Sequence, residues 1–133
     1  MIDIAPYVGI PYLNRGRNMF GIDCWGIVRL IYKDALNITL GTLDGYADSE
    51  SKDQVSRVIK SESAAHWKEV DAPREYDVVV FNLAGKPCHV GLMLNGYKFI
   101  HSLAGRDTCI ESISKVIWRD RIDSIYRHKP CQS

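Results

Sequence analysis

A cysteine at the start of a predicted helix and two histidines in a predicted hairpin are the residues of this sequence best suited to chemistry. In "GIDCWGIVRLIY" (21–32), Cys24 follows Asp23, and apolar residues then recur every three to four positions. Asp is a favoured N-cap residue, so we expect a helix to begin at Cys24. The thiol then lies near unpaired backbone N–H groups and the positive end of the helix dipole, which favours the nucleophilic thiolate.

Two histidines could supply the base that such a nucleophile needs. "HVGLML" (89–94) alternates as a strand does, and "YKFIHS" (97–102) follows across an Asn-Gly pair, a strong signal for a two-residue hairpin turn. In a tight hairpin of this length His89 and His101 are neighbours to within one register step. A nucleophile, a base and an orienting partner are the parts of covalent catalysis, and the sequence predicts that Cys24, His89 and His101 supply them.

Each of these residues also has a structural interpretation. A single cysteine at a helix start is more often a buried apolar residue, and a single histidine in a strand more often has a hydrogen-bonded structural role. We assign His66 and His128 to that structural class, because neither lies in the predicted cysteine–hairpin group. For Cys24, His89 and His101 the sequence favours catalysis, because three separate positions agree with one catalytic arrangement.

The four cysteines predict neither a disulfide framework nor a zinc site. They lack paired C-x-x-C spacing, and four in 133 residues do not indicate a disulfide-dense fold. No subset of the candidate zinc ligands has finger-like spacing, and adjacent strand residues point to opposite faces. Those candidates are Cys88, His89, His101, His128 and Cys131. We therefore expect no metal and no cofactor.

Length and composition are those of one globular domain, which we expect to span residues 1–133. The hydrophobic (46%) and charged (25%) fractions are ordinary, and a net charge of +1 lacks the basic surplus of nucleic-acid-binding proteins. The start, "MIDIAPYVGI", has no signal-peptide pattern, and no stretch approaches the roughly 18 consecutive apolar residues of a membrane span. We expect synthesis in the cytoplasm, no nucleic-acid partner and no membrane insertion.

Helix patterns precede strand patterns along the chain, which predicts an α+β fold. After the helix over 24–36, Ser51 and Gln54 form a capping box that predicts a second, shorter helix. Beyond Pro73 the pattern is that of short strands. We expect strands over 77–81, 89–94, 97–102, 107–113 and 121–128. The helices should pack on one side of an antiparallel sheet.

These blocks together resemble the NlpC-type cysteine peptidases, a papain-like family that cleaves peptidoglycan stem peptides. The family pattern is a D-C-[SW]-G-L-V helix start, a G-D-[VL]-[VL]-x-F strand, an H-V-G-[IL] strand and a hairpin ending in [FY]-[IL]-H. Their counterparts stand in order in "GIDCWGIVRLIY" and "EYDVVVFNLAGKPCHVGLMLNGYKFIHS", and the resemblance covers most of residues 9–128. It implies N-terminal helices, with the cysteine at a helix start, packed on a five- to six-stranded antiparallel sheet.

The resemblance also implies a role for each matching residue. Cys24 matches the nucleophile, His89 the general base and His101 the third, orienting residue. Tyr12 in "GIPY" matches a tyrosine at the oxyanion and substrate side of the cleft, and Asp23 matches an acid that helps hold the amino group of the stem peptide. The implied reaction is hydrolysis of a stem-peptide amide, at the bond from D-γ-glutamyl to the diamino acid.

One branch of the family, the short single-domain versions of tailed phages, resembles the chain in more detail. Trp25 after the cysteine and the ending "VIWRDRIDSIYRHKP" carry this resemblance. It implies a tail-tip or tail-assembly protein in the virion tail, with peptidoglycan and tail hub proteins as partners. Two alternatives stay open: a structural tail subunit with a weak or vestigial peptidase site, and a related acyltransferase, whose usual motif order of His before Cys does not match.

Three features depart from the family pattern. Tyr76 stands where the family usually has glycine before Asp77, which we expect to alter the turn into that strand. "LNRGRNMFG" (13–21) replaces a more glycine-rich stretch, and Cys88 beside the predicted base is unusual and is expected to be structural. These departures bear on specificity, because none removes a predicted catalytic group.

Overall fold

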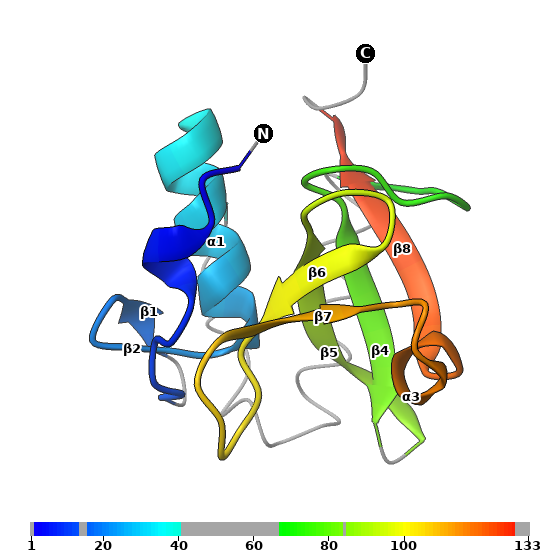
Figure 1. Ribbon diagram of the computed structural model, residues 1–133. Coiled ribbons are helices and arrows are strands. Elements are labelled where there is room, and N and C mark those ends of the chain that lie inside the picture. The colour runs from blue at the N-terminus through cyan, green and yellow to red at the C-terminus, as the bar shows by residue number, and fades with distance from the viewer. Residues whose placement is uncertain (1, 14–15, 41–66, 84, 130–133) are drawn as a thin grey trace.

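The fold is a curved antiparallel sheet with a helix packed beside it (Figure 1). The computed structural model describes residues 2–13, 16–40, 67–83 and 85–129. The elements are η1 (Ala5–Tyr7), β1 (Arg17–Asn18), β2 (Gly21–Ile22), α1 (Cys24–Leu36), β3 (Trp67–Glu69), β4 (Val78–Leu83), β5 (Lys86–Met93), β6 (Lys98–His101), β7 (Cys109–Ser112), α3 (Val116–Arg119) and β8 (Ile122–His128). The second helix predicted from Ser51 lies outside the described residues.

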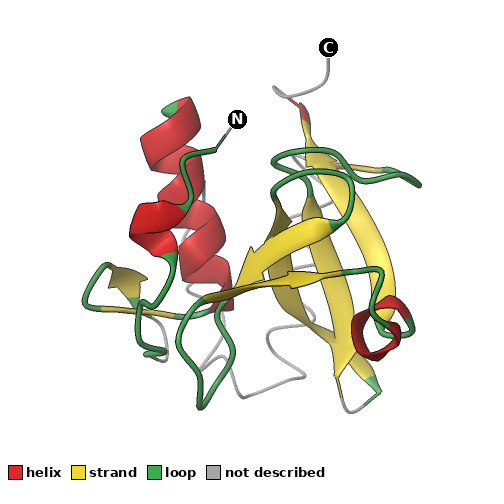
Figure 2. Ribbon diagram, viewed as in Figure 1, coloured by secondary structure: helices red, strands yellow, loops and turns green. Residues whose placement is uncertain are grey.

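Six strands form the sheet in the order β3-β8-β4-β5-β6-β7, and every pairing is antiparallel. The predicted α+β architecture is therefore confirmed, and Figure 2 shows the long helix standing to one side of the strands. The two-stranded ribbon of β1 and β2, together with β3 and α3, was not predicted. These elements are two to four residues long, too short for a periodic pattern to be read.

The helix α1 begins at the predicted residue. Asp23 is its N-cap, and the Asp23 carboxylate accepts the backbone N–H of Gly26 at 2.8 Å. The helix ends before Asn37, which adopts a left-handed conformation with φ of 56°. Its apolar side is fully buried and consists of Ile27, Val28, Ile31 and Tyr32. None of the described helices has the length and apolar character needed to span a bilayer.

Alternation along β5 divides the core between the two faces of the sheet. Val90 and Leu92 belong to the apolar cluster that includes α1. Met93 belongs to a second cluster, together with Trp118 of α3. Because side chains alternate along a strand, His89 lies on the Met93 face, as predicted. The helix and the two clusters thus enclose β5 from both sides.

The predicted hairpin between β5 and β6 is present, but its turn is not the predicted two-residue turn. Met93 pairs with Phe99, which is one register step away from the pairing that a two-residue turn at Asn95 and Gly96 would give. Residues 94–97 therefore connect the strands. The Asn95 side chain accepts the backbone N–H groups of Tyr97 and of Lys98, the first residue of β6, at 2.9 and 2.8 Å. An Asn side chain can replace a backbone acceptor in this way, which makes a wider turn around the Asn-Gly pair.

Candidate active site

The position of Cys24 is fixed by close packing around the first turn of α1. Cys24 is the first residue of the helix and is 5% exposed. A Cβ atom at Gly26 would collide with the backbone carbonyl of Gly16, so only glycine allows that segment to approach the helix. Asp23 is fully buried as the N-cap. The substrate role that was predicted for Asp23 stays a prediction.

The start of α1 is joined to the end of β6. The Ser102 hydroxyl donates a buried hydrogen bond of 2.8 Å to the carbonyl of Ile22, which lies two residues before Cys24. Ser102 directly follows His101. The helix packs against β5 and β6, and Figure 1 shows its first turn beside the arrowhead of β6. The fold thus brings the segment that carries Cys24 to the strands that carry His89 and His101.

His89 and His101 form a hydrogen-bonded pair. Nε2 of His89 lies 2.8 Å from Nδ1 of His101, and the ring centroids are 5.1 Å apart. The side chains are buried, with exposed fractions of 3% and 0%. The prediction that these residues are neighbours is confirmed. The pairing also identifies the nitrogens involved, which the sequence does not.

Aromatic rings hold both imidazoles in place. Phe81 stacks on His89 with centroids 6.0 Å apart, and Phe99 lies 4.9 Å from His101. The Phe99 ring occupies space that Gly91 leaves open, since a Cβ atom at Gly91 would lie 2.7 Å from the ring. The indole of Trp118 lies 4.9 Å from His101. The orientation of each imidazole is therefore set by packing as well as by the hydrogen bond.

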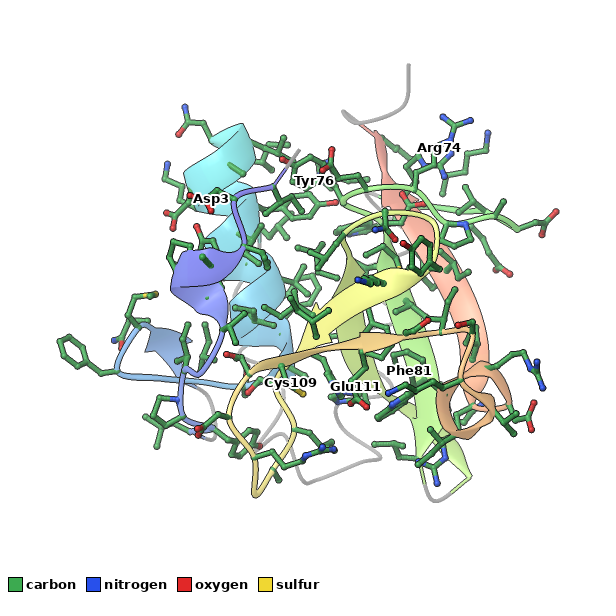
Figure 3. The ribbon with its side chains drawn as sticks, in the orientation of Figure 1. Asp3, Arg74, Tyr76, Phe81, Cys109 and Glu111 are labelled. Carbon is green, nitrogen blue, oxygen red and sulfur yellow. The ribbon has the colours of Figure 1, made fainter. Side chains whose placement is uncertain are left out.

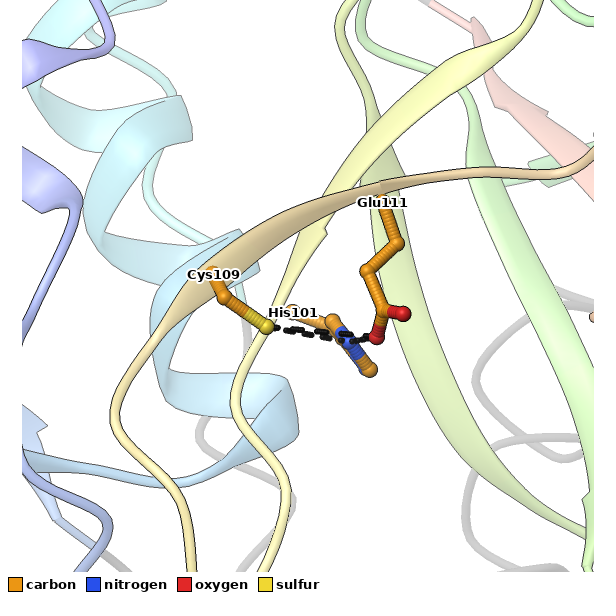
Figure 4. Close-up of side chains that lie close together, drawn as sticks. All are labelled: His101, Cys109 and Glu111. Atoms are coloured by element: carbon orange, nitrogen blue, oxygen red, sulfur yellow. Dashed lines mark hydrogen bonds and ion pairs between the residues drawn. The ribbon is translucent and has the colours of Figure 1, made fainter.

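Two residues that were not selected from the sequence as site residues complete the cluster. Nε2 of His101 lies 2.7 Å from Oε2 of Glu111 and 3.6 Å from Sγ of Cys109 (Figure 4). Both residues project from β7 in Figure 3, and β7 pairs with β6 so that Cys109 is opposite His101. Alternation in "DTCIESI" places the two on one face. The β6–β7 register, which the sequence does not provide, is needed to show that this face meets His101.

The electrostatics of this cluster favour a neutral imidazole beside an ionised carboxylate. Burial lowers the pKa of His101, and Glu111 opposes this shift only in part. Burial raises the pKa of Glu111, but Trp118, His101 and Arg106 together outweigh it and lower that pKa. The indole N–H of Trp118 makes no hydrogen bond to a described residue. Its polarity nevertheless favours the ionised form of Glu111 and lowers the pKa of that carboxyl group. Nη1 of Arg106 lies 3.9 Å from Oε2 of Glu111.

His101, Cys109 and Glu111 are also the one group of possible metal ligands found among the described residues, with ligand atoms within 4.8 Å of one another. The 2.7 Å separation between His101 and Glu111 is that of a hydrogen bond. Burial, followed by the Glu111 charge, raises the pKa of the Cys109 thiol, and Arg106 places a positive charge beside the carboxylate. These features favour a hydrogen-bonded cluster over a cation site.

Of the zinc ligands considered from the sequence, His89 and His101 lie together, but His128 does not join them. The His128 ring lies 4.9 Å from Trp67, which belongs to the cluster on the α1 side of the sheet. This packing agrees with the structural role expected for His128. His66 and Cys131 lie outside the described residues, and the side chain of Cys88 is not described.

Tyr12 lines a pocket of about 370 Å³, together with Pro11, Gly105, Arg106 and Asp107. Arg106 also lies 3.9 Å from Glu111, so one residue of the pocket lining contacts the cluster. The Tyr12 backbone forms a bridge with Ile22, close to the start of α1. Its predicted role toward the oxyanion stays a prediction.

Residues 9–127 match the model of the NlpC/P60 family. The chain belongs to the NlpC/P60 family. It is 24% identical over 127 residues to murein DD-endopeptidase MepS/murein LD-carboxypeptidase of Escherichia coli (strain K12), which covers 96% of this chain and 60% of that protein. It is 28% identical over 96 residues to protein P54 of Enterococcus faecium, which covers 72% of this chain and 16% of that protein. The chain thus spans 60% or less of these two relatives.

Solved structures of NlpC/P60 proteins have the same fold. The NlpC/p60 domain of the peptidoglycan hydrolase SagA superposes with a TM-score of 0.61 at 23% identity, over 91% of this chain and 89% of that one. An NlpC/P60 family protein from Bacillus cereus superposes with a TM-score of 0.68 at 23% identity, over 92% of this chain and 36% of that one. The papain-like fold implied by the sequence motifs is therefore confirmed.

Proposed function

We propose that this NlpC/P60 chain is a cysteine endopeptidase of peptidoglycan stem peptides, with Cys24 as nucleophile, His89 as base and His101 as the orienting residue. The observation that carries the proposal is the buried 2.8 Å hydrogen bond between the two histidines, on strands against which α1 packs. The family supports it, as do relatives named as a murein endopeptidase and a peptidoglycan hydrolase.

The hydrogen bond suggests which nitrogen acts as the base. Because Nε2 of His89 is engaged by His101, Nδ1 is the nitrogen that would take the proton of Cys24. The thiolate would attack the amide carbonyl carbon to form a tetrahedral oxyanion. Collapse would break the C–N bond, with His89 protonating the leaving amine and a thioester remaining on Cys24. Water, deprotonated by His89, would then hydrolyse the thioester and restore the thiol.

Two groups could stabilise the oxyanion. The backbone N–H of Cys24 lies at the start of α1, at the positive end of the helix dipole. Tyr12 lies on the neighbouring segment and could donate its hydroxyl. Removing one oxyanion donor typically lowers kcat by about 10²–10³-fold. We propose that the bond cleaved is the one from D-γ-glutamyl to the diamino acid. The Escherichia coli relative is named both as a DD-endopeptidase and as an LD-carboxypeptidase, so the bond must be identified from the products.

Digestion of purified peptidoglycan, with mass spectrometry of the released peptides, tests the proposal. We expect cleavage by the wild type and none by Cys24→Ala. Cys109→Ser is the matched control, because Cys109 is a second thiol beside the same histidine pair. It should cleave as the wild type does. Cleavage by folded Cys24→Ala, or loss of cleavage only in Cys109→Ser, would show that the nucleophile is wrongly assigned.

We further propose that the chain acts in a phage tail tip during penetration of the cell wall. This part rests on the resemblance of Trp25 and the C-terminal segment to the phage branch. Deleting the gene and replacing Cys24 separate the two roles. Normal tails that carry the Cys24→Ala protein but penetrate poorly would support an enzymatic tail component. Loss of tails on deletion, with normal penetration by Cys24→Ala virions, would favour a structural subunit with a vestigial site.

A further inference from the structure

We propose that Glu111 is a positioning residue that sets which nitrogen of His89 acts as the base. The inference rests on the proposed peptidase function, in which His89 acts on Cys24. Neither the sequence motifs nor the family resemblance selected Glu111. It enters through its contact with His101, whose side chain is fully buried.

The three side chains form one chain of hydrogen bonds. Nε2 of His89 lies 2.8 Å from Nδ1 of His101, and Nε2 of His101 lies 2.7 Å from Oε2 of Glu111. A neutral imidazole has one N–H donor and one acceptor nitrogen, whereas an ionised carboxylate only accepts. The proton of His101 must therefore lie on Nε2, facing Glu111. Its Nδ1 then accepts from Nε2–H of His89, which leaves the lone pair of neutral His89 on Nδ1.

The surroundings keep each member in the required state. Arg106, 3.9 Å from Oε2, and the Trp118 indole favour the ionised form of Glu111. Burial of His101 favours its neutral form, so it relays a hydrogen bond and does not hold a charge. The Cys109 thiol lies 3.9 Å from the same carboxylate oxygen, and its raised pKa keeps it protonated. The Glu111 carboxylate, 2.7 Å from Nε2 of His101, is thus the ionised acceptor that fixes the direction of these hydrogen bonds.

If these hydrogen bonds ran in the opposite direction, His89 could not act as the base. If Nδ1 of His101 carried the proton, it would donate to Nε2 of His89. Neutral His89 would then hold its own proton on Nδ1 and could not take one from Cys24. Glu111 also stabilises the imidazolium that His89 becomes once it has accepted the thiol proton. No proton moves from Glu111 or His101 in this scheme, so the carboxylate acts only through position and charge.

Nitrogen-15 NMR of the histidine rings in the 133-residue chain tests the inference directly, because long-range ¹H–¹⁵N spectra distinguish the two imidazole tautomers. In the wild type we expect the protons of both His89 and His101 on Nε2. Glu111→Leu removes the acceptor and should shift His101 wholly or partly to the Nδ1–H form. Glu111→Gln can still accept through its amide oxygen, so it should retain more of the wild-type tautomer than Glu111→Leu does.

Kinetics on a stem peptide should follow the same order. Hydrogen bonds to charged groups contribute about 1.5–3 kcal/mol, which corresponds to a loss of about 10–100-fold in kcat for Glu111→Leu. Glu111→Gln should lose less, and KM should change little in either variant. Glu69→Leu is the matched control, since Glu69 is an exposed glutamate of β3 that lies outside the histidine pair and its contacts. Its tautomers and kcat should stay close to those of the wild type.

Two results would overturn the inference. One is a wild-type His101 that carries its proton on Nδ1. The other is a folded Glu111→Leu variant in which tautomers and kcat are unchanged. The proposed function fails separately: a wild type that has the expected tautomers but cleaves no stem peptide would refute the peptidase and leave the hydrogen-bond chain established. Cleavage by a wild type with reversed tautomers would refute only the role of Glu111.

Discussion

Histidine occurs in two aromatic clusters of this protein, and its polar contacts differ between them. The helix-side cluster consists of Trp25, Tyr32, Trp67, Tyr76 and His128. The histidine-pair cluster consists of Phe81, His89, Phe99, His101 and Trp118. In the first, the nearest ring to His128 lies at 4.9 Å, and in the second the rings of Phe99 and Trp118 lie at that same distance from His101.

Ring packing therefore does not separate a structural histidine from a candidate catalytic one. What distinguishes His101 is its place between a second imidazole and a carboxylate, with a hydrogen bond of 2.8 Å on one side and 2.7 Å on the other. These two partners determine which nitrogen of the His101 ring donates a hydrogen bond and which accepts one. The rings around the pair limit its motion, and the polar chain gives the pair its chemistry.

Replacing one histidine in each cluster should give the largest contrast. His89→Ala should lower hydrolysis of a stem peptide by about 10²–10⁴-fold, the usual contribution of a general acid–base group. His128→Ala should leave the rate near that of the wild type but destabilise the fold by about 2–3 kcal/mol, because it leaves a cavity between rings. Steady-state rates and denaturant unfolding of both variants measure this. A fully active His89→Ala, or a His128→Ala that is stable but inactive, would reverse the assignment of the clusters.

Crowding the histidine pair should have an intermediate effect. In Gly91→Ala the added Cβ would lie 2.7 Å from the Phe99 ring, which is buried and cannot move freely. Overpacking of this kind costs about 1–3 kcal/mol, and a displaced Phe99 should also lower activity through its contact with His101. Gly96→Ala is the matched control, because its nearest neighbour would be an ordinary contact at 3.8 Å. Equal stability of the two variants would show that the site tolerates more volume than the packing indicates.

Acidification should destabilise the fold through the histidine-pair cluster. Burial lowers the pKa of His101 in the folded state below its value in the unfolded chain, about 6.5. The unfolded chain then binds the proton more readily, so stability is present above that pKa and is lost as the pH falls through the lower folded value. Thermal unfolding of the wild type should show this loss below about pH 6.5. His101→Gln should show less of it, and identical pH profiles would contradict the prediction.

The parts of the fold that depend on neighbouring residues could be predicted from the sequence. The start of α1 at Cys24 follows from Asp23 and the apolar period, both of which are local signals. The neighbourhood of His89 and His101 follows from one short hairpin. Glu111 could not be predicted, because its place depends on the register of β7 against β6 across the loop that follows His101. A strand pattern shows which residues share a face, and only the pairing shows what that face meets.

At Tyr76 the sequence departs from the family pattern, and the structure shows what this departure means for the backbone. The family resemblance placed glycine before Asp77, and Tyr76 has a φ of 73°, in the left-handed region that glycine adopts most readily. The tyrosine ring brings a compensating contact, since it lies 6.1 Å from the ring of Tyr32. The backbone carbonyl of residue 76 accepts the Tyr32 hydroxyl at 2.5 Å, a hydrogen bond that does not depend on the side chain. Ring packing in the helix-side cluster thus offsets the backbone strain at Tyr76.

Two substitutions at this position should separate strain from packing, with the smallest effect predicted here. Both Tyr76→Ala and Tyr76→Gly lose the ring, but only glycine relieves the left-handed backbone, which costs other residues about 1–2 kcal/mol. We therefore expect both variants to be less stable than the wild type in denaturant unfolding, with Tyr76→Gly more stable than Tyr76→Ala by about 1 kcal/mol. At an unstrained position the order would be the reverse, so a more stable alanine variant would contradict the prediction. Neither change should alter the tautomers of His89 and His101, because Tyr76 belongs to the other cluster. A tautomer shift in either variant would show that the two clusters are coupled through the sheet.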